Sequence, residues 1–328
     1  MTVQPLLFLE DVAQLARSEG GRNIWEARHL SRLEPFKHLD LPDLIYVVDF
    51  PGRGIGQEFL LGRQICGPRK FLMIREIGHS MVRLFARRFV GRVAQFVILW
   101  GGRPLDLLDA NPPIFRDEVF DTTYIKLTRV EDTSAPRGWR VVKSSVVGQI
   151  WPDPTWLLQE ECVASGETLA YFANETLAVH RPRQLFLFPV CASAEGIAAM
   201  NTVCRNHGVE LIPVLNEAIV QVAAEGVRKP FTDLGLQPRT IVSRTFHSAL
   251  HYRYQGKPLC WLGDVGDSLY KPVEHLIETV EDMAALDWDF GQEDFSHWPT
   301  MTASPEVLDV IAQRWPAVAE MARTQLGV

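Results

Sequence analysis

The feature that most constrains the fold is the alternation of continuous apolar runs and helical patterns through the middle of the chain. Residues 93–100, 184–190 and 209–215 are apolar along their length, which is typical of strands buried on both faces of a parallel sheet. Helical patterns over residues 167–178 and 194–207 lie between these runs. The alternation predicts an α/β fold, in which a mainly parallel twisted sheet is covered by helices on both faces.

A second informative feature is the segment 156–169, where an apolar run ends in the adjacent carboxylates Glu160 and Glu161. The small residues Ala164, Ser165 and Gly166 then form a turn into a helical pattern. Such a turn lets backbone N–H groups surround a phosphate at a helix N-terminus, where the helix dipole also favours an anion. Two carboxylates beside it can accept hydrogen bonds from vicinal hydroxyls. The segment therefore predicts a site for ribose 5-phosphate, with an ordinary strand-to-helix turn as the alternative.

The apolar run 93–100 ends in a glycine-rich loop, Gly101, Gly102 and Arg103. Glycine lets a backbone approach a diphosphate closely, and a guanidinium group pairs well with phosphate oxygens. The loop is a candidate diphosphate site. A plain glycine turn with an arginine on the surface remains the alternative.

Three stretches of the chain resemble one enzyme family. Segment 156–169 resembles the phosphoribosyl-diphosphate (PRPP) motif of type I phosphoribosyltransferases, in which an apolar strand and two acidic residues precede a Thr/Ser-Gly-x-Thr turn. Residues 262–270 resemble the Gly-Asp-x-Gly-Asp-Arg-x-Phe block of the uracil phosphoribosyltransferases, and residues 191–197 resemble their Ala-x-Pro-Glu-Gly-Ile segment. The chain departs from the pattern in having glutamates in place of aspartates, in Gln159 and in Glu167.

The resemblance implies transfer of ribose 5-phosphate from PRPP to a ring acceptor, with release of diphosphate. It also implies Mg²⁺ as the cofactor, bound through PRPP and water and not directly by protein side chains. A non-catalytic sensor of PRPP or a nucleotide on the same fold is the main alternative. An unrelated α/β enzyme with similar glycine turns is a third.

The resemblance also implies roles for individual residues. The catalytic group comprises Glu160, Glu161, Asp264 and Asp267. The 5-phosphate is expected to contact Ala164, Ser165, Gly166, Glu167 and Thr168. The diphosphate is expected to contact Gly101, Gly102, Arg103, Lys126 and Arg129.

The acceptor is expected to lie against Cys260, Trp261, Leu262 and Gly263. In the uracil enzymes main-chain groups just before the Gly-Asp-x-Gly-Asp block bind the base, and Trp261 stands where those enzymes have a glycine. A bulky indole there changes the pocket, and Ser268 replaces the usual arginine. The sequence therefore predicts an acceptor other than uracil.

The polar stretch 131–145 follows a predicted β segment, 119–130. In the resembled family a flexible loop at this point closes over the substrate and excludes water. Three basic residues of this stretch either contact the diphosphate or face solvent, namely Arg137, Arg140 and Lys143.

The chain is expected to divide into a core of residues 71–275, with an inserted segment 218–256, and two flanks. The N-terminal extension 1–70 has a helical pattern at residues 9–18 and an apolar strand at residues 44–50. Residues 276–328 are expected to form C-terminal helices. The resemblance adds a small hood over the sheet.

Composition excludes several classes of function. The 328 residues carry a formal charge of −7, which gives no electrostatic reason to expect a nucleic-acid partner. No apolar stretch approaches the roughly 20 residues of a membrane span. The five cysteines lack metal-ligand spacing and are expected to be reduced core residues of a cytoplasmic protein. The resemblance further implies a homodimer.

Overall fold

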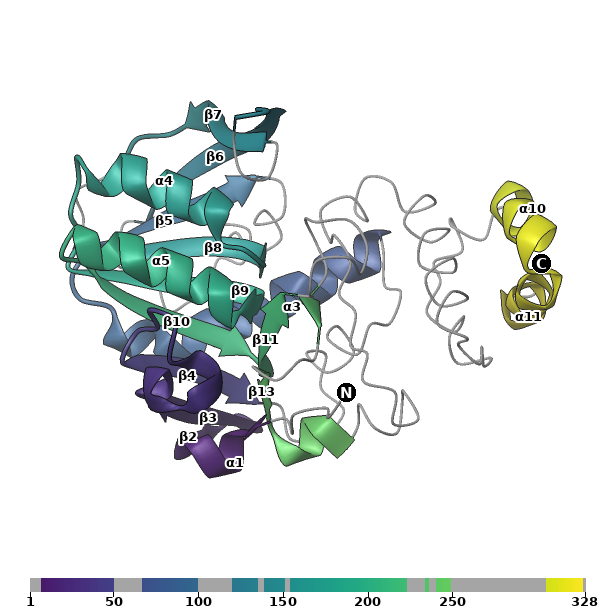
Figure 1. Ribbon diagram of the computed structural model, residues 1–328, viewed down its shortest axis with the longest axis horizontal. Coiled ribbons are helices and arrows are strands. Elements are labelled where there is room, and N and C mark those ends of the chain that lie inside the picture. The colour runs from purple at the N-terminus through teal and green to yellow at the C-terminus, as the bar shows by residue number, and fades with distance from the viewer. Residues whose placement is uncertain are drawn as a thin grey trace.

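The computed structural model describes residues 7–49, 67–99, 120–134, 139–150, 154–222, 234–235, 240–248 and 305–326. Its main strands are β2 (Ala13–Glu19), β3 (Arg22–Arg28), β4 (Leu44–Asp49), β5 (Val93–Leu99), β6 (Phe120–Glu131), β7 (Trp139–Val147), β8 (Thr155–Val163), β9 (Gln184–Ser193) and β10 (Glu210–Asn216). They form one sheet in the order β2-β3-β4-β10-β9-β8-β5-β6-β7 (Figure 1).

The centre of this sheet is parallel. Strands β4, β10, β9, β8, β5 and β6 each run parallel to their neighbours, while β3, β2 and β7 are added antiparallel at the two sides. The predicted α/β class with a mainly parallel sheet is confirmed. In Figure 1 the parallel strands point to the right, so their carboxyl ends share one edge of the sheet.

Helices cover both faces of the sheet. Helix α3 (Gly67–Phe85) packs on one face, where its residues Ile77, Met81 and Phe85 join sheet residues such as Phe188 in one buried cluster. Helices α4 (Glu167–Leu177) and α5 (Ala194–Asn206) lie on the other face, in front of the strands in Figure 1. The apolar strands are therefore buried from both sides, as their sequence predicts.

Short strands extend the sheet beside the end of β9. Strand β11 (Ala218–Val222) pairs in parallel with β9 and antiparallel with β13 (Ile241–Val242), and β13 also pairs with β1 (Leu7–Phe8). Strand β12 (Leu234–Gly235) pairs with β11. Part of the inserted segment thus joins the first described residues of the chain.

Two sequence predictions are wrong. Residues 9–18, expected to be helical, form the four-residue helix α1 (Leu9–Val12) followed by strand β2, which is held by pairing with β3. Much of the polar stretch 131–145, expected to be a loop, belongs to strand β7, which forms a hairpin with β6. In both cases a cross-strand partner outweighs the local pattern.

The C-terminal residues 305–326 form two helices, α10 (Pro305–Arg314) and α11 (Pro316–Leu326), which contact each other. Proline lacks a backbone N–H, so Pro316 is compatible with the first position of a new helix. No helix within the described ranges is long and apolar enough to cross a membrane. The described cysteines, Cys162, Cys191 and Cys204, are free thiols, and burial raises the pKa of Cys204 to about 12.

Candidate functional site

Polar side chains gather at the carboxyl ends of the parallel strands. The ends of β4, β8 and β10 carry Asp49, Glu161 and Asn216, and Ser193 ends β9; all four are buried. Ligands of open parallel sheets bind outside the carboxyl ends of the strands. This edge, at the right of the sheet in Figure 1, is therefore the candidate active site.

The turn between β8 and α4 packs directly on the start of α5. Gly166 caps α4 in the left-handed region, with φ of 73°, and a Cβ added there would lie 2.5 Å from the carbonyl oxygen of Gly196. A Cβ on Gly196 would in turn lie 2.6 Å from the carbonyl oxygen of Ala164. Only glycine fits at both positions. The backbone of the turn 164–166 is therefore in direct contact with the backbone at the start of α5.

Ser193 joins the same two segments through its hydroxyl. Its Oγ accepts a hydrogen bond from the Gly196 N–H at 2.9 Å, which caps α5, and donates to the carbonyl oxygen of Ala164. An N-cap serine satisfies one of the amide groups that a helix start leaves without a partner. The turn is thus fixed by one buried side chain as well as by glycine packing.

Several amide groups of this turn have no hydrogen-bond acceptor among the described residues. Within the described ranges the N–H groups of Ser165, Gly166 and Thr168 donate no hydrogen bond to another residue, and that of Glu167 makes a long contact of 3.5 Å with Ser165 Oγ. Unpaired amides at the positive end of a helix dipole bind anions such as phosphate. The structure therefore brings residues 164–168 together in one compact turn at the start of α4, which is the arrangement that the phosphate prediction requires.

The two carboxylates stand just before the turn 164–168 and differ in exposure. Glu160 is half-buried, and its Oε1 accepts a hydrogen bond from the Glu161 N–H at 3.1 Å. Glu161 is buried, with 1% of its surface exposed. Glu160 is therefore the carboxylate with the more accessible oxygens.

The structure separates the two basic residues of β6. Gln159 and Tyr124 both pair with Val97 of β5, so Lys126 lies level with Glu161 across the carboxyl end of β5. Arg129 lies three residues further along the hairpin, roughly 10 Å beyond Lys126, and is exposed. Of these two basic residues, Lys126 is the one level with the carboxylates Glu160 and Glu161.

The remaining candidates lie outside the described residues, namely Gly101, Gly102, Arg103, Cys260, Trp261, Leu262, Gly263, Asp264 and Asp267. Within the part of the chain that the structure describes, no group of three His, Cys, Asp or Glu side chains could hold a metal ion.

Sequence reasoning missed a buried pair of carboxyl groups at this edge. Asp49 is hydrogen-bonded to Glu217 and to Ser243, whose Oγ lies 3.4 Å from Asp49 Oδ1, and burial raises the pKa of Asp49. Glu217 is buried in the left-handed region, with φ of 61°. The two buried carboxyl groups therefore lie at the ends of the neighbouring strands β4 and β10. A sequence signal existed, because Asn216 and Glu217 end an apolar run as Glu160 and Glu161 do.

No model of a protein family matches this sequence, and no curated protein matches it. Solved structures do resemble the fold at low identity. The AQ2163 protein from Aquifex aeolicus is similar with a TM-score of 0.46 and 13% identity, over 68% of this chain and 97% of that chain. Orotate phosphoribosyltransferase from Mycobacterium tuberculosis is similar with a TM-score of 0.33 and 15% identity, over 49% and 93%. Adenine phosphoribosyl transferase from Trypanosoma brucei is similar with a TM-score of 0.35 and 11% identity, over 55% and 87%.

Proposed function

We propose that this protein is a PRPP-dependent phosphoribosyltransferase that transfers ribose 5-phosphate to a ring acceptor other than uracil. The observation that carries the proposal is the turn 164–168, in which Gly166 packs on Gly196 and leaves several amide groups without a protein partner in the described ranges. Two carboxylates precede this turn directly, so one segment offers contacts to both a phosphate and sugar hydroxyls.

In this proposal the amides of residues 164–168 hold the 5-phosphate. Glu160, the more accessible carboxylate, accepts hydrogen bonds from the ribose hydroxyls, and Glu161 supports it from the buried side. Lys126, paired with Leu99 at the end of β5, adds positive charge at this edge for the diphosphate. Because the turn amides bind the 5-phosphate and Glu160 binds the ribose hydroxyls, the orientation of the pentose is fixed before reaction.

The reaction is a displacement at C1 of the pentose. The bond from C1 to the diphosphate oxygen breaks, its electron pair leaves with the diphosphate, and a ring nitrogen or carbon of the acceptor forms the new bond to C1. The pentose carries positive charge in the transition state, which the nearby carboxylates stabilise. The acceptor is proposed to lie against Cys260, Trp261, Leu262 and Gly263, with Trp261 against its ring.

Magnesium fits this site only as a hydrated ion that arrives with PRPP. The described residues offer Glu160 and Glu161 as oxygen ligands or as acceptors for the ion's water, and oxygen is the ligand that Mg²⁺ prefers. When bound, the ion neutralises the charge of the departing diphosphate.

Diphosphate release from PRPP, measured with Mg²⁺ across a panel of heteroaromatic acceptors that includes uracil, tests the proposal. We expect acceptor-dependent release that is fastest with a ring other than uracil and is lost in Glu160→Gln. Release that is fastest with uracil contradicts the altered acceptor pocket. PRPP binding without release for any acceptor contradicts the transferase and favours the sensor.

A further inference from the structure

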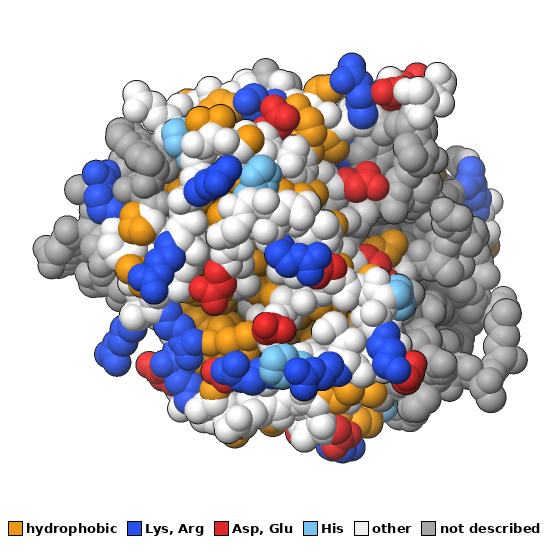
Figure 2. Space-filling view, turned by 60° about the vertical axis from the view of Figure 1, so that its left-hand side comes forward, with side chains coloured by type: hydrophobic (Ala, Val, Ile, Leu, Met, Phe, Trp, Pro, Cys, Tyr) orange, Lys and Arg blue, Asp and Glu red, His pale blue; other side chains and the backbone are white. Residues whose placement is uncertain are grey.

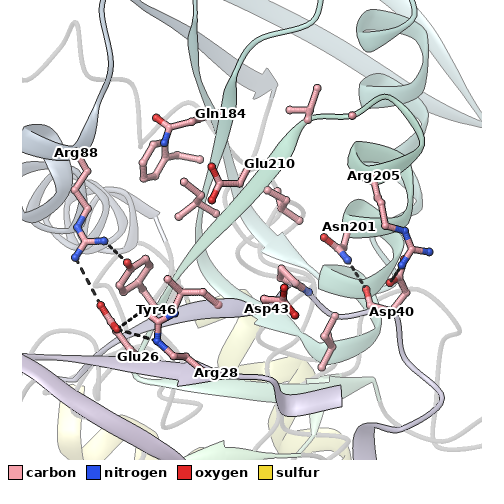
Figure 3. A pocket seen from close by; sticks show the side chains of 18 residues that line it. Glu26, Arg28, Asp40, Asp43, Tyr46, Arg88, Gln184, Asn201, Arg205 and Glu210 are labelled. Carbon is pink, nitrogen blue, oxygen red and sulfur yellow. Dashed lines mark hydrogen bonds and ion pairs between the residues drawn. The ribbon is translucent and has the colours of Figure 1, made fainter. Parts of the chain in front are cut away.

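A second hollow lies at the opposite edge of the sheet. It has a volume of about 920 Å³ and opens at the amino ends of β4, β10 and β9 (Figure 3). A strand of seven residues separates the two edges by roughly 20 Å, so this hollow is distinct from the turn 164–168. Its volume is in the range of small-molecule sites.

One wall of the hollow carries excess positive charge. Arg28 donates to Glu26 Oε2 through Nη2 at 2.7 Å, and Arg88 Nη2 lies 3.7 Å from Glu26 Oε1. One carboxylate thus serves two guanidinium groups, as Figure 3 shows. A second carboxylate on this wall would balance the charge, and guanidinium groups hold carboxylates well.

Tyr46 adds a neutral donor to the same wall. Its hydroxyl oxygen accepts a hydrogen bond from Arg88, and burial raises the pKa of Tyr46, so the phenol keeps its own proton at neutral pH. A phenol that accepts one hydrogen bond can still donate one. The wall formed by Arg28, Arg88 and Tyr46 therefore presents donors to an anion.

The other wall presents acceptors. Gln184 and Glu210 are paired in register at the starts of β9 and β10, so their side chains are neighbours. Gln184 Oε1 is buried and accepts no hydrogen bond from any residue within the described ranges. Glu210 is exposed and has no ion-pair partner in the same part of the chain. A ligand with an ammonium group would pair with the exposed Glu210 carboxylate, beside Gln184.

The floor between these walls suits an aliphatic ligand more than an aromatic one. Leu44 and Ile212 are half-buried, whereas the Phe186 ring is fully buried and packs against Phe89 at 5.0 Å between ring centroids. The Tyr46 ring is covered by the Arg88 guanidinium, 4.7 Å from its centroid. Figure 2, which brings this side forward, shows apolar surface between cationic and anionic side chains. Tyr46 is the aromatic residue labelled in Figure 3, and the Arg88 guanidinium takes the position over its ring where a ligand would stack.

The far end of the hollow contains an ion pair of its own, Arg205 with Asp40. Arg205 Nη1 donates to Asp40 Oδ1 at 2.6 Å, and Asn201 Nδ2 donates to the carbonyl oxygen of Asp40 at 3.0 Å. This pair needs no ligand, and Arg205 provides a control for charge loss in the same hollow.

We propose that this hollow binds a small aliphatic amino carboxylate, with its carboxylate on Arg28 and Arg88 and its ammonium group between Gln184 and Glu210. Strands β3 and β10 are two spacings apart, roughly 10 Å, and the side chains reach inward from both. A chain of about four or five methylenes, similar to a lysine side chain, spans the remaining distance over Leu44 and Ile212. This inference does not depend on the proposed transferase activity.

Calorimetric titration of the full chain with ε-aminocaproate, caproate and hexylamine tests the proposal. We expect ε-aminocaproate to bind at least ten-fold more tightly than either ligand that lacks one charged end. Absence of saturable binding of ε-aminocaproate overturns the proposal. Equal affinity for caproate overturns the role of Gln184 and Glu210.

Variants assign the two ends of the ligand. Glu210→Gln is expected to reduce the affinity for ε-aminocaproate to that for caproate, and Arg28→Met to that for hexylamine. Arg205→Met is the control and is expected to leave the affinity unchanged, with folding checked by the thermal midpoint. If Arg205→Met weakens binding as much as Arg28→Met does, the ligand lies elsewhere in the hollow and the proposed orientation is wrong.

Discussion

The backbones of Gly166 and Gly196 are in direct contact at the starts of α4 and α5. A Cβ on Gly166 would lie 2.5 Å from the Gly196 carbonyl oxygen and 2.9 Å from its Cα. Backbone atoms cannot move aside as the end of a flexible side chain can. The contact therefore determines where the amide groups of the turn 164–168 point.

Gly166→Ala is expected to destabilise the protein more than an equivalent change at an open site. Gly208 is the matched control, because it has a similar φ of 69° but no heavy atom within 4 Å of an added Cβ. Gly208→Ala should cost about 1–2 kcal/mol for the left-handed conformation alone. Gly166→Ala should cost about 1–3 kcal/mol more from overpacking. Equal losses in equilibrium urea unfolding contradict the close contact.

Ser193→Ala is expected to weaken both stability and phosphate binding. It removes the cap of α5 and the hydrogen bond to Ala164, at a cost of about 1 kcal/mol. Ser243→Ala is the control, since Ser243 likewise accepts from a backbone amide, the Phe246 N–H at 3.1 Å, but donates to Asp49 and not to the turn. Titration with ribose 5-phosphate should show weaker binding for Ser193→Ala alone. Similar affinities for both variants would show that the serine does not position the turn.

Lys126→Met is expected to lower kcat/KM for PRPP about ten-fold or more, because Lys126 lies level with Glu161 at the end of β5. Arg129→Met should change kcat/KM by less than about two-fold, since Arg129 is exposed further along the hairpin. Steady-state kinetics with varied PRPP measure both. The opposite ranking would place the diphosphate over the hairpin.

Asp49→Asn is expected to alter the pH dependence of stability. Because burial raises the pKa of Asp49, the folded state holds the proton more tightly than the unfolded chain. The contribution of Asp49 is therefore fully present below its ordinary pKa of about 3.9 and is lost as pH rises through the raised value. Thermal midpoints from pH 4 to pH 8 should fall less for Asp49→Asn than for the native chain.

The exposed Asp43 supplies the control for this experiment, since its side chain is 89% exposed. Asp43→Asn removes the same charge without changing a buried group. If Asp43→Asn and Asp49→Asn give parallel pH profiles, the pKa of Asp49 is not raised in the folded state and the prediction is wrong.

The sequence predicted the centre of the fold because its strands are apolar on both faces. The runs at residues 93–100, 184–190 and 209–215 need no knowledge of their partners to be recognised as buried strands. Strands β2 and β7 escaped recognition because most of their described residues are exposed. Only pairing with β3 and β6 makes them strands. Their conformation depends on tertiary contacts that local patterns do not contain.

The candidate site was predictable where it is continuous in sequence. Residues 160–168 form one strand end and one turn, so a motif could specify them. The pair of Asp49 and Glu217 was not predictable in the same way, because it depends on β4 lying beside β10. The hollow around Glu26, Arg88 and Glu210 likewise requires the strand order.

Amide hydrogen exchange with and without ribose 5-phosphate tests the central claim most directly. The account predicts slower exchange at the amides of Ser165, Gly166 and Thr168 when the ligand is bound, because these N–H groups would then donate to phosphate oxygens. Amides at the opposite edge, such as that of Glu210, should be unchanged. Saturable binding of ribose 5-phosphate with no slowing of exchange across residues 164–168 would contradict it.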